Sequence, residues 1–178
     1  MPAIYTIGHS NRSVDEFIVL LREHDVTVLA DIRTVPKSRH NPQFGQDQLP
    51  ASLQEAGIAY VYMKDLGGLR KTSGDSPNTG WRNTSFRGYA DWMQTEAFKA
   101  AIGELIALAD DETVAIMCAE AVPWRCHRSL VGDALLVRGV EVIDIMGPGS
   151  VRLERLTPFA VVDGTAITYP ADEGDEPA

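Results

Sequence analysis

Five short apolar runs recur along the chain, and each is rich in β-branched or aromatic side chains. They occupy residues 3–7, 27–32, 58–63, 113–118 and 140–146. The runs are nearly continuous rather than alternating, which is typical of strands buried on both faces of a parallel sheet. The pattern therefore predicts five buried strands.

Between these runs, apolar residues recur with the period of a helix. Ser13 and Glu16 form a capping box, and an apolar stripe over 14–21 follows it. Further helical patterns cover 49–56, 98–109 (beginning near Tyr89) and 130–137. The alternation of strands and helices predicts an α/β fold, a Rossmann-like, doubly wound, mostly parallel five-stranded sheet with helices on both faces.

Two features follow the fifth run. The segment FAVVDGTAITY predicts a C-terminal hairpin with Asp163 and Gly164 at its turn. The acidic end, ADEGDEPA, predicts a disordered tail. We therefore expect a single α/β domain over 1–170 and a tail over 171–178.

A long polar loop separates the third strand from the following helix. Residues 64–87 are rich in Ser, Thr, Asn and Gly. Connections of this length within a compact domain are uncommon, and they often serve as lids or binding loops. We expect this loop to reach a functional site.

Chemically active side chains follow three of the predicted strands. His9 and Ser10 come after the first, Asp31 and Arg33 close the second, and Cys118 and Glu120 follow the fourth. In open α/β sheets ligands bind at the carboxyl ends of the strands, where the strand order reverses. An order of 3-2-1-4-5 makes the first and fourth strands neighbours and predicts one site for these residues.

Composition narrows the classes of function. The chain has 178 residues, of which 44% are hydrophobic and 23% are charged. No apolar run is long enough to span a membrane, and no signal peptide is readable at the N-terminus. The 2 cysteines are more typical of reduced thiols than of a disulfide framework. We expect a cytoplasmic protein without a membrane partner.

The charge is unevenly distributed. The net charge is −9, yet residues 33–87 contain eight Lys and Arg against four Asp and Glu. An acidic chain with a basic middle does not favour nucleic acid as a partner, but it is suited to one local anion. A small anionic ligand, such as a nucleotide, is the expected partner. No cofactor and no oligomeric state follow from the sequence.

Three motifs resemble the bacterial family called domain of unknown function 488. They are TIGHSNRSVDEF, DIRTVPKSRHNPQF and CAEAVPWRCHRSL, and the resemblance as a whole covers roughly residues 3–145. The resemblance implies an α/β protein without an assigned reaction. It also implies that the matching positions matter, namely Gly8, His9, Ser10, Asp31, Arg33, Pro36, Arg39, Phe44, Cys118, Glu120, Cys126, His127 and Arg128.

Three chemistries fit these residues. Cys118, at a strand end near two arginines, is a candidate nucleophile whose alternative role is a buried apolar thiol. Cys118, Cys126 and His127 are soft metal ligands, but their spacing argues against a shared ion and we expect no metal. Glu120 and Asp31 are candidate acid–base carboxylates, unless they only tie the loops together through arginine pairs.

The sequence as a whole predicts an enzyme, a hydrolase or transferase, acting on a small phosphorylated or nucleotide-like anion. Its candidate catalytic residues are Glu120, Asp31, His9 and Cys118. Its candidate ligand-binding residues are Ser10, Arg33, Arg39, Arg128 and His127. A non-catalytic nucleotide or nucleic-acid sensor is one alternative, and a thiol or metal redox protein built on Cys118 and Cys126 is another.

Arg125 and Arg128 lie at the start of a predicted helix. Helix N-termini favour anions over cations, so each guanidinium calls for a partner of opposite sign. We expect either a bound anion or a buried carboxylate, Glu120 or Asp31, to supply it.

Overall fold

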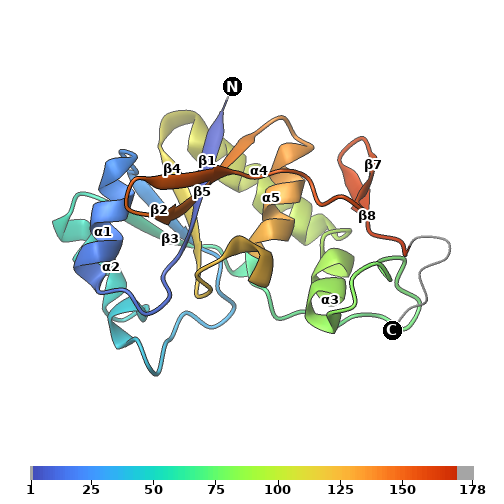
Figure 1. Ribbon diagram of the computed structural model, residues 1–178, viewed down its shortest axis with the longest axis horizontal. Helices are drawn as coiled ribbons and strands as arrows, with labels where there is room; N and C mark the ends of the chain where they lie inside the picture. Colours follow the sequence, from blue (N-terminus) through green and yellow to red (C-terminus); the bar gives the residue numbers. More distant parts are fainter. Residues whose placement is uncertain (1, 172–178) are drawn as a thin grey trace.

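The computed structural model describes residues 2–171 of the chain (Figure 1). Its strands are β1 (Ala3–Gly8), β2 (Val28–Asp31), β3 (Ala59–Tyr62), β4 (Val114–Cys118), β5 (Glu141–Gly147), β6 (Ser150–Leu153), β7 (Val161–Asp163) and β8 (Ala166–Thr168). Its α-helices are α1 (Val14–Glu23), α2 (Leu49–Glu55), α3 (Thr84–Trp92), α4 (Glu96–Asp111) and α5 (Arg128–Leu136). Short 3-10 turns are η1 (Pro42–Phe44), η2 (Lys64–Leu66) and η3 (Pro123–Arg125).

The five apolar runs form five parallel strands of one mixed sheet. Within the described residues, this sheet has six strands in the order β3-β2-β4-β1-β5-β6. The sixth, β6, was not expected, and it pairs antiparallel with β5. The α/β class and the mostly parallel sheet are thus confirmed.

The predicted strand order is wrong at one place. β1 and β4 are neighbours, as expected, but β4 rather than β1 lies beside β2. Both strands are apolar, so hydrophobicity alone does not decide which is more central. In the observed order, the end of β4 lies between the ends of β1 and β2. Cys118 pairs with Gly8 of β1, and Met117 pairs with Asp31 of β2.

Alternate residues of the strands face two separate cores. In β4, Ile116 and Cys118 join one core, and Ala115 and Met117 join the other. The period of two in a strand produces this division. Buried residues of α3, α4 and α5 complete the first core, and those of α1 and α2 complete the second. Cys118 therefore faces the side of α3, α4 and α5.

Local signals place the helix ends. Ser13 caps α1, because its hydroxyl accepts from the backbone N–H of Glu16 at 3.1 Å, and the same hydroxyl donates to the Glu16 carboxylate at 3.0 Å. The helix expected from near Tyr89 to residue 109 is instead two helices, α3 and α4. Thr95 separates them: its hydroxyl donates to the Trp92 carbonyl at 2.7 Å and accepts from the Phe98 N–H at 3.3 Å.

The C-terminal hairpin forms a two-stranded sheet of its own. Asp163 pairs with Ala166, so the turn consists of Gly164 and Thr165 rather than Asp163 and Gly164. Gly164 has a φ of 65°, which glycine adopts without strain. Of the predicted acidic tail, 171–178, all but Ala171 lies outside the described residues.

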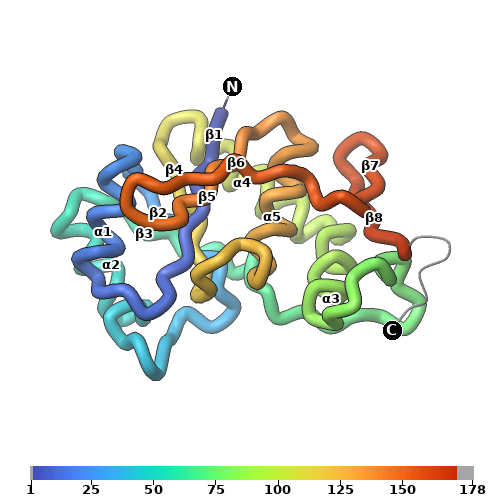
Figure 2. Tube along the Cα trace, in the orientation of Figure 1, coloured from blue at the N-terminus to red at the C-terminus, as the bar shows by residue number. Residues whose placement is uncertain are grey.

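The chain after the hairpin braces the long loop that precedes α3. The Gly80 N–H donates to the Tyr169 carbonyl at 2.7 Å, and the Tyr169 N–H donates to the Asn78 side chain at 2.9 Å. Figure 2 shows this red segment running beside the green loop and α3. In the described part of the chain, no helix has the length and apolar character needed to cross a membrane.

Glu154 is a carboxyl group buried just after β6. It is 8% exposed, and its Oε2 has no hydrogen-bond partner among the described residues. Burial, followed by the nearby carboxyls of Asp144 and Asp133, raises the pKa of Glu154 to about 9. The folded chain therefore keeps this carboxyl protonated at neutral pH, whereas the unfolded chain ionises it near pH 4.5.

This difference predicts a pH-dependent stability. Between about pH 5 and 9 the folded state holds one proton more than the unfolded state. The free energy of unfolding therefore falls as pH rises through that window, by up to about 1.4 kcal/mol per pH unit for this group. Glu154→Gln is expected to flatten this slope and to raise the stability at pH 8 by at least about 1 kcal/mol. Urea denaturation of both proteins at pH 5 to 9 measures this, and parallel profiles would contradict it.

Candidate functional site

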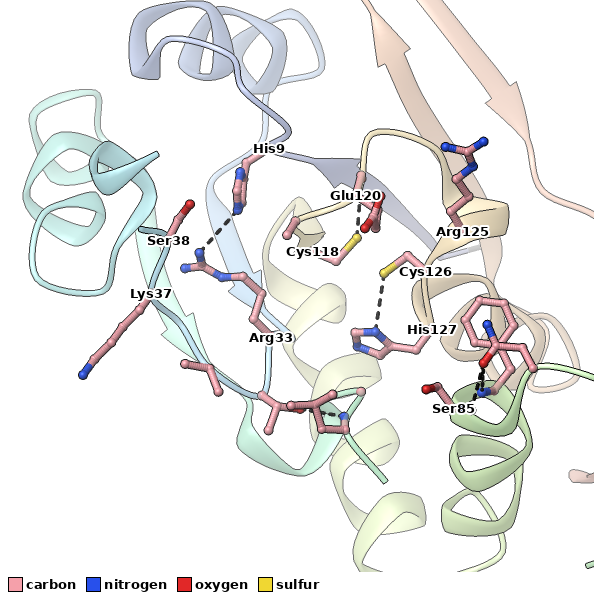
Figure 3. Close-up of a pocket in the computed structure, with 17 residues that line it drawn as sticks. His9, Arg33, Lys37, Ser38, Ser85, Cys118, Glu120, Arg125, Cys126 and His127 are labelled. Carbon is pink, nitrogen blue, oxygen red and sulfur yellow. Dashed lines mark hydrogen bonds between the residues drawn. The ribbon is translucent and has the colours of Figure 1, made fainter. Parts of the chain in front are cut away.

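A cavity of about 490 Å³ lies at the carboxyl ends of β1, β2 and β4 (Figure 3). Its wall is formed by residues that follow these strands, by the turn before α5, and by both ends of the long polar loop. These residues are His9, Arg33, Thr34, Val35, Lys37, Ser38, Gly68, Leu69, Asn83, Ser85, Phe86, Cys118, Ala119, Glu120, Arg125, Cys126 and His127.

Only some of the predicted site residues line this cavity. Those that do are His9, Arg33, Cys118, Glu120 and His127. Arg39 instead lines a second recess of about 760 Å³, which shares Lys37 and Ser38 with the first. Asp31, Ser10 and Arg128 do not line either space, but each bonds a residue of the first cavity: Asp31 bonds Arg33, Ser10 bonds His9 and Arg128 bonds Glu120.

Asp31 and Arg33 form a buried ion pair. The Asp31 side chain is 0% exposed, and its two oxygens accept from the Arg33 Nε at 2.9 Å and from a terminal guanidinium nitrogen at 2.7 Å. The Tyr60 hydroxyl also donates to Asp31. Such bidentate geometry fixes the plane of the guanidinium. Asp31 therefore positions Arg33, and its oxygens are already occupied.

His9 is buried beside this pair. Its Nδ1 lies 2.7 Å from the Ser10 carbonyl, and its Nε2 lies 3.5 Å from an Arg33 nitrogen that can only donate. Nδ1 therefore carries the proton and Nε2 accepts. Burial, opposed by the Ser10 hydrogen bond and reinforced by the Arg33 charge, lowers the pKa of His9. His9 is thus a neutral imidazole with its lone pair turned toward Arg33.

His127 is a second neutral imidazole, on the opposite side of the thiols. Its Nε2 donates to the Ile32 carbonyl at 2.9 Å, which leaves the Nδ1 lone pair facing the Cys126 sulfur at 3.4 Å. Burial lowers the pKa of His127 to about 4, despite this backbone hydrogen bond. His127 therefore stays neutral, and its Nδ1 can accept a hydrogen bond from the Cys126 thiol.

The two thiols influence each other's pKa, and the two pKa values shift in opposite directions. Burial raises the pKa of Cys118, but the Cys126 thiol and the Arg128 charge oppose burial, and the net direction is downward. Burial and the neighbouring Cys118 raise the pKa of Cys126 well above its usual value. Of the two thiols, Cys118 is therefore the one that ionises more readily, as expected for a sulfur beside a buried guanidinium.

Arg128 lies beneath the cavity rather than in its wall. It is 0% exposed, and its guanidinium donates to the Thr6 hydroxyl and to the carbonyls of Glu120 and Ala121, each at 3.2 Å. Among the described residues no carboxylate pairs directly with it; the expected Glu120 contact is made by the backbone, not by the carboxylate. Arg128 thus holds the loop after β4, and its positive charge lowers the pKa of Cys118.

Glycine allows this loop to approach β1 closely. A Cβ on Gly8 would overlap the carbonyl oxygen of Glu120, and the backbone N–H groups of His9 and Ser10 bond the Cys118 and Ala119 carbonyls at 2.9 and 3.0 Å. His9 and Cys118 are therefore neighbours, as predicted. Any side chain at Gly8 must displace the loop that carries Cys118 and Glu120.

The cavity wall is basic. Arg33, Lys37 and Arg125 line it, and Glu120 is the acidic side chain of the lining set. Lys37 was not among the predicted site residues. It belongs to the basic segment 33–87 but does not directly follow a strand. The long loop does reach the site, where it contributes Gly68, Leu69, Asn83, Ser85 and Phe86.

No cluster of three or more His, Cys, Asp or Glu side chains with the geometry of a metal site is found within residues 2–171. Cys126 and His127 instead contact one another, and His127 directs its other nitrogen to a backbone carbonyl.

The fold and the site define a class of α/β proteins with a mostly parallel sheet and a basic, thiol-containing cavity at its carboxyl edge. Residues 13–135 match the family model described as Domain of unknown function DUF488, and the chain belongs to that family. This match covers every part of the cavity wall except His9. No curated protein and no solved structure matches the chain.

The close approach at Gly8 predicts a large effect of a single methyl group. Gly8→Ala is expected to destabilise the fold by about 2 kcal/mol or more, because the backbone of the 119–121 loop must move. Gly103→Ala is the matched control: this glycine is exposed within α4 with nothing near its Cβ, so the change is expected to stabilise by about 1 kcal/mol. Denaturant unfolding compares them, and equal stabilities would contradict the assigned contact.

The buried charge predicts the reactivity of Cys118. Arg128→Met is expected to raise the pKa of Cys118 and to slow its alkylation by iodoacetamide at neutral pH about tenfold. Stranded carbonyls at Glu120 and Ala121 should also cost about 1–3 kcal/mol of stability. Arg125→Gln, which removes an exposed guanidinium, is the control. If the pH dependence of alkylation shifts equally in Arg128→Met and Arg125→Gln, the specific effect of Arg128 on Cys118 is contradicted.

Proposed function

We propose that this protein is a thiol-dependent enzyme, a hydrolase or transferase, that acts on a small anionic ligand such as a phosphorylated or nucleotide-like compound. In this proposal it is a cytoplasmic protein with a Rossmann-like, doubly wound sheet. The observation that carries the proposal is the placement of the Cys118 sulfur in the wall of a basic cavity, beside a buried guanidinium that favours its thiolate form.

The ligand's charge is the part of the proposal that the cavity supports most directly. Arg33 is held rigidly by Asp31, so its remaining guanidinium nitrogen presents a fixed donor. Lys37 and Arg125 are exposed and can close on an anion from the rim. Leu69 and Phe86 add apolar surface to the same wall, which suits a ligand with a non-polar group beside its charge.

The proposed reaction has two steps. The Cys118 thiolate attacks an acyl carbon or a phosphorus atom, forming a bond to sulfur, and the leaving group departs with the electrons of the broken bond and takes a proton from solvent. Glu120 then removes a proton from water, or from an acceptor hydroxyl in a transferase. The resulting oxygen attacks the covalent intermediate and releases the Cys118 thiolate.

His9 and Asp31 have supporting roles in this proposal. The neutral His9 accepts from Arg33 through Nε2 and so leaves the positive charge on the guanidinium, where it meets the anion. Asp31 orients Arg33 and takes no part in proton transfer. Arg128, in place of the ligand-binding role expected from the sequence, sets the charge of Cys118.

Turnover of a substrate panel tests this function. Chromogenic phosphate and acetate esters of nitrophenol, and acetyl phosphate, are incubated with the protein while product release and intact mass are followed. Cys118→Ser is expected to reduce turnover at least about 100-fold and to form no covalent adduct on sulfur. Glu120→Gln is expected to accumulate the adduct, and Glu104→Gln, on the exposed face of α4, should behave as wild type.

Two outcomes would contradict the proposal. Turnover that survives Cys118→Ser would remove the thiol from the mechanism. Phosphate or nucleotide binding, seen as an increase in Tm, without turnover of any panel member would favour the sensor alternative.

A further inference from the structure

The second thiol of the chain lies against the first. Figure 3 shows the sulfurs of Cys118 and Cys126 facing each other within the cavity wall. Each thiol also shifts the pKa of the other, as expected for neighbouring sulfurs. Both are free thiols, 2% and 5% exposed. The proposed reaction requires only one nucleophile, so a second sulfur in contact with it needs a separate explanation.

The two cysteines come from different segments that end at the same cavity. Cys118 ends β4, and its carbonyl accepts from the His9 N–H. Cys126 lies between η3 and α5 with an extended backbone, at φ −133° and ψ 147°, and its sulfur accepts from the Arg128 N–H at 3.4 Å. A disulfide requires the two sulfurs to close from contact to about 2 Å. Disulfide formation would therefore replace this Arg128 contact with a bond to Cys118.

The pair also has the division of protons that disulfide formation uses. Cys118 ionises more readily and so supplies the thiolate that attacks an electrophilic oxygen, and Cys126 keeps its proton to a higher pH and lies 3.4 Å from His127 Nδ1. A reactive sulfur with a protonated neighbour in contact is the arrangement found where one cysteine is oxidised and a second resolves it.

The cavity gives a small oxidant access to both thiols. The cavity of about 490 Å³ is bounded by exposed residues at Ala119, Glu120 and Arg125. A hydroperoxide molecule is much smaller than this space. It carries no charge, so it needs none of the basic side chains to enter.

We propose that Cys118 and Cys126 form an oxidation site for hydroperoxides, which converts the pair reversibly into a disulfide. The Cys118 thiolate attacks the outer peroxide oxygen, the O–O bond breaks, and the sulfur becomes a sulfenic acid while the alkoxide or hydroxide takes up a proton. The Cys126 sulfur then attacks the sulfenic sulfur. The sulfenyl hydroxyl leaves with the Cys126 proton as water, and an external dithiol reduces the disulfide by exchange.

Disulfide formation has a direct consequence for the cavity. It replaces the thiolate beside Arg128 with an uncharged sulfur and removes the S–H that His127 accepts. Cys118 is then blocked as a nucleophile until a dithiol reduces the disulfide. The disulfide also protects Cys118 from irreversible oxidation. The inference rests on the thiolate assigned under the proposed function but not on turnover of any substrate.

The test uses the full chain and hydrogen peroxide. Wild-type protein is treated with one equivalent, and then intact mass, free thiols and the disulfide-linked peptides of a proteolytic digest are measured. Loss of two hydrogen atoms, loss of both thiols, a peptide linking Cys118 to Cys126, and full recovery with dithiothreitol are expected. Cys126→Ser is expected to stop at a dimedone-reactive sulfenic acid at Cys118, and Cys118→Ser to react at least about tenfold more slowly.

Several results would overturn the inference. Sulfinic acid at Cys118 in the wild type without any linked peptide would show that Cys126 does not resolve it. Oxidation of Cys126 first, or equal rates in wild type and Cys118→Ser, would contradict the assigned order. The mapping on unmodified wild type keeps the test decisive if a serine variant fails to fold. Turnover that survives Cys118→Ser, together with a peroxide-formed disulfide, would remove the proposed function and leave this site intact.

Discussion

The guanidinium of Arg128, buried where β1 and β4 end, is the constraint on which the site depends. It donates to a hydroxyl of β1 and to two carbonyls of the loop after β4, and it has no direct carboxylate partner among the described residues. Burying a cation is costly unless charge and hydrogen bonds compensate it. The two carbonyls and the Thr6 hydroxyl, which donates in turn to Asp144, provide hydrogen bonds that offset this cost. The same contacts fix the sulfur at the cavity.

A second buried guanidinium, that of Arg33, follows the neighbouring strand β2 and has a carboxylate partner. Arg33 forms an ion pair with Asp31, and this pair turns it toward His9 and the cavity. The two arginines therefore have distinct effects. Arg33 is held by a carboxylate and oriented as a donor in the wall, whereas Arg128 has no carboxylate partner among the described residues and lowers the pKa of a thiol. Both imidazoles remain neutral because they are buried beside these cations.

The element pattern could be predicted well because it depends on local chemistry. The apolar runs became strands, and Ser13 capped α1 as its capping box indicated. The errors occurred where distant contacts decide. Thr95 divided a continuous apolar stripe into α3 and α4, and the pairing of Asp163 with Ala166 moved the hairpin turn by one residue. The order of β1 and β4 depends on pairing between two equally apolar strands.

By itself, the sequence determined that polar side chains gather at the carboxyl ends of three strands, because strand ends follow from hydrophobic runs and parallel strands end at one edge. It therefore placed His9, Arg33, Cys118 and Glu120 together. Only the tertiary structure decided what each one does. Asp31 was a candidate catalyst, but its oxygens bond Arg33, and Arg128 was a candidate ligand-binding residue, but its side chain bonds the loop after β4. A residue's type limits its chemistry, but protonation and direction depend on neighbours distant in the chain, and these are set only by packing.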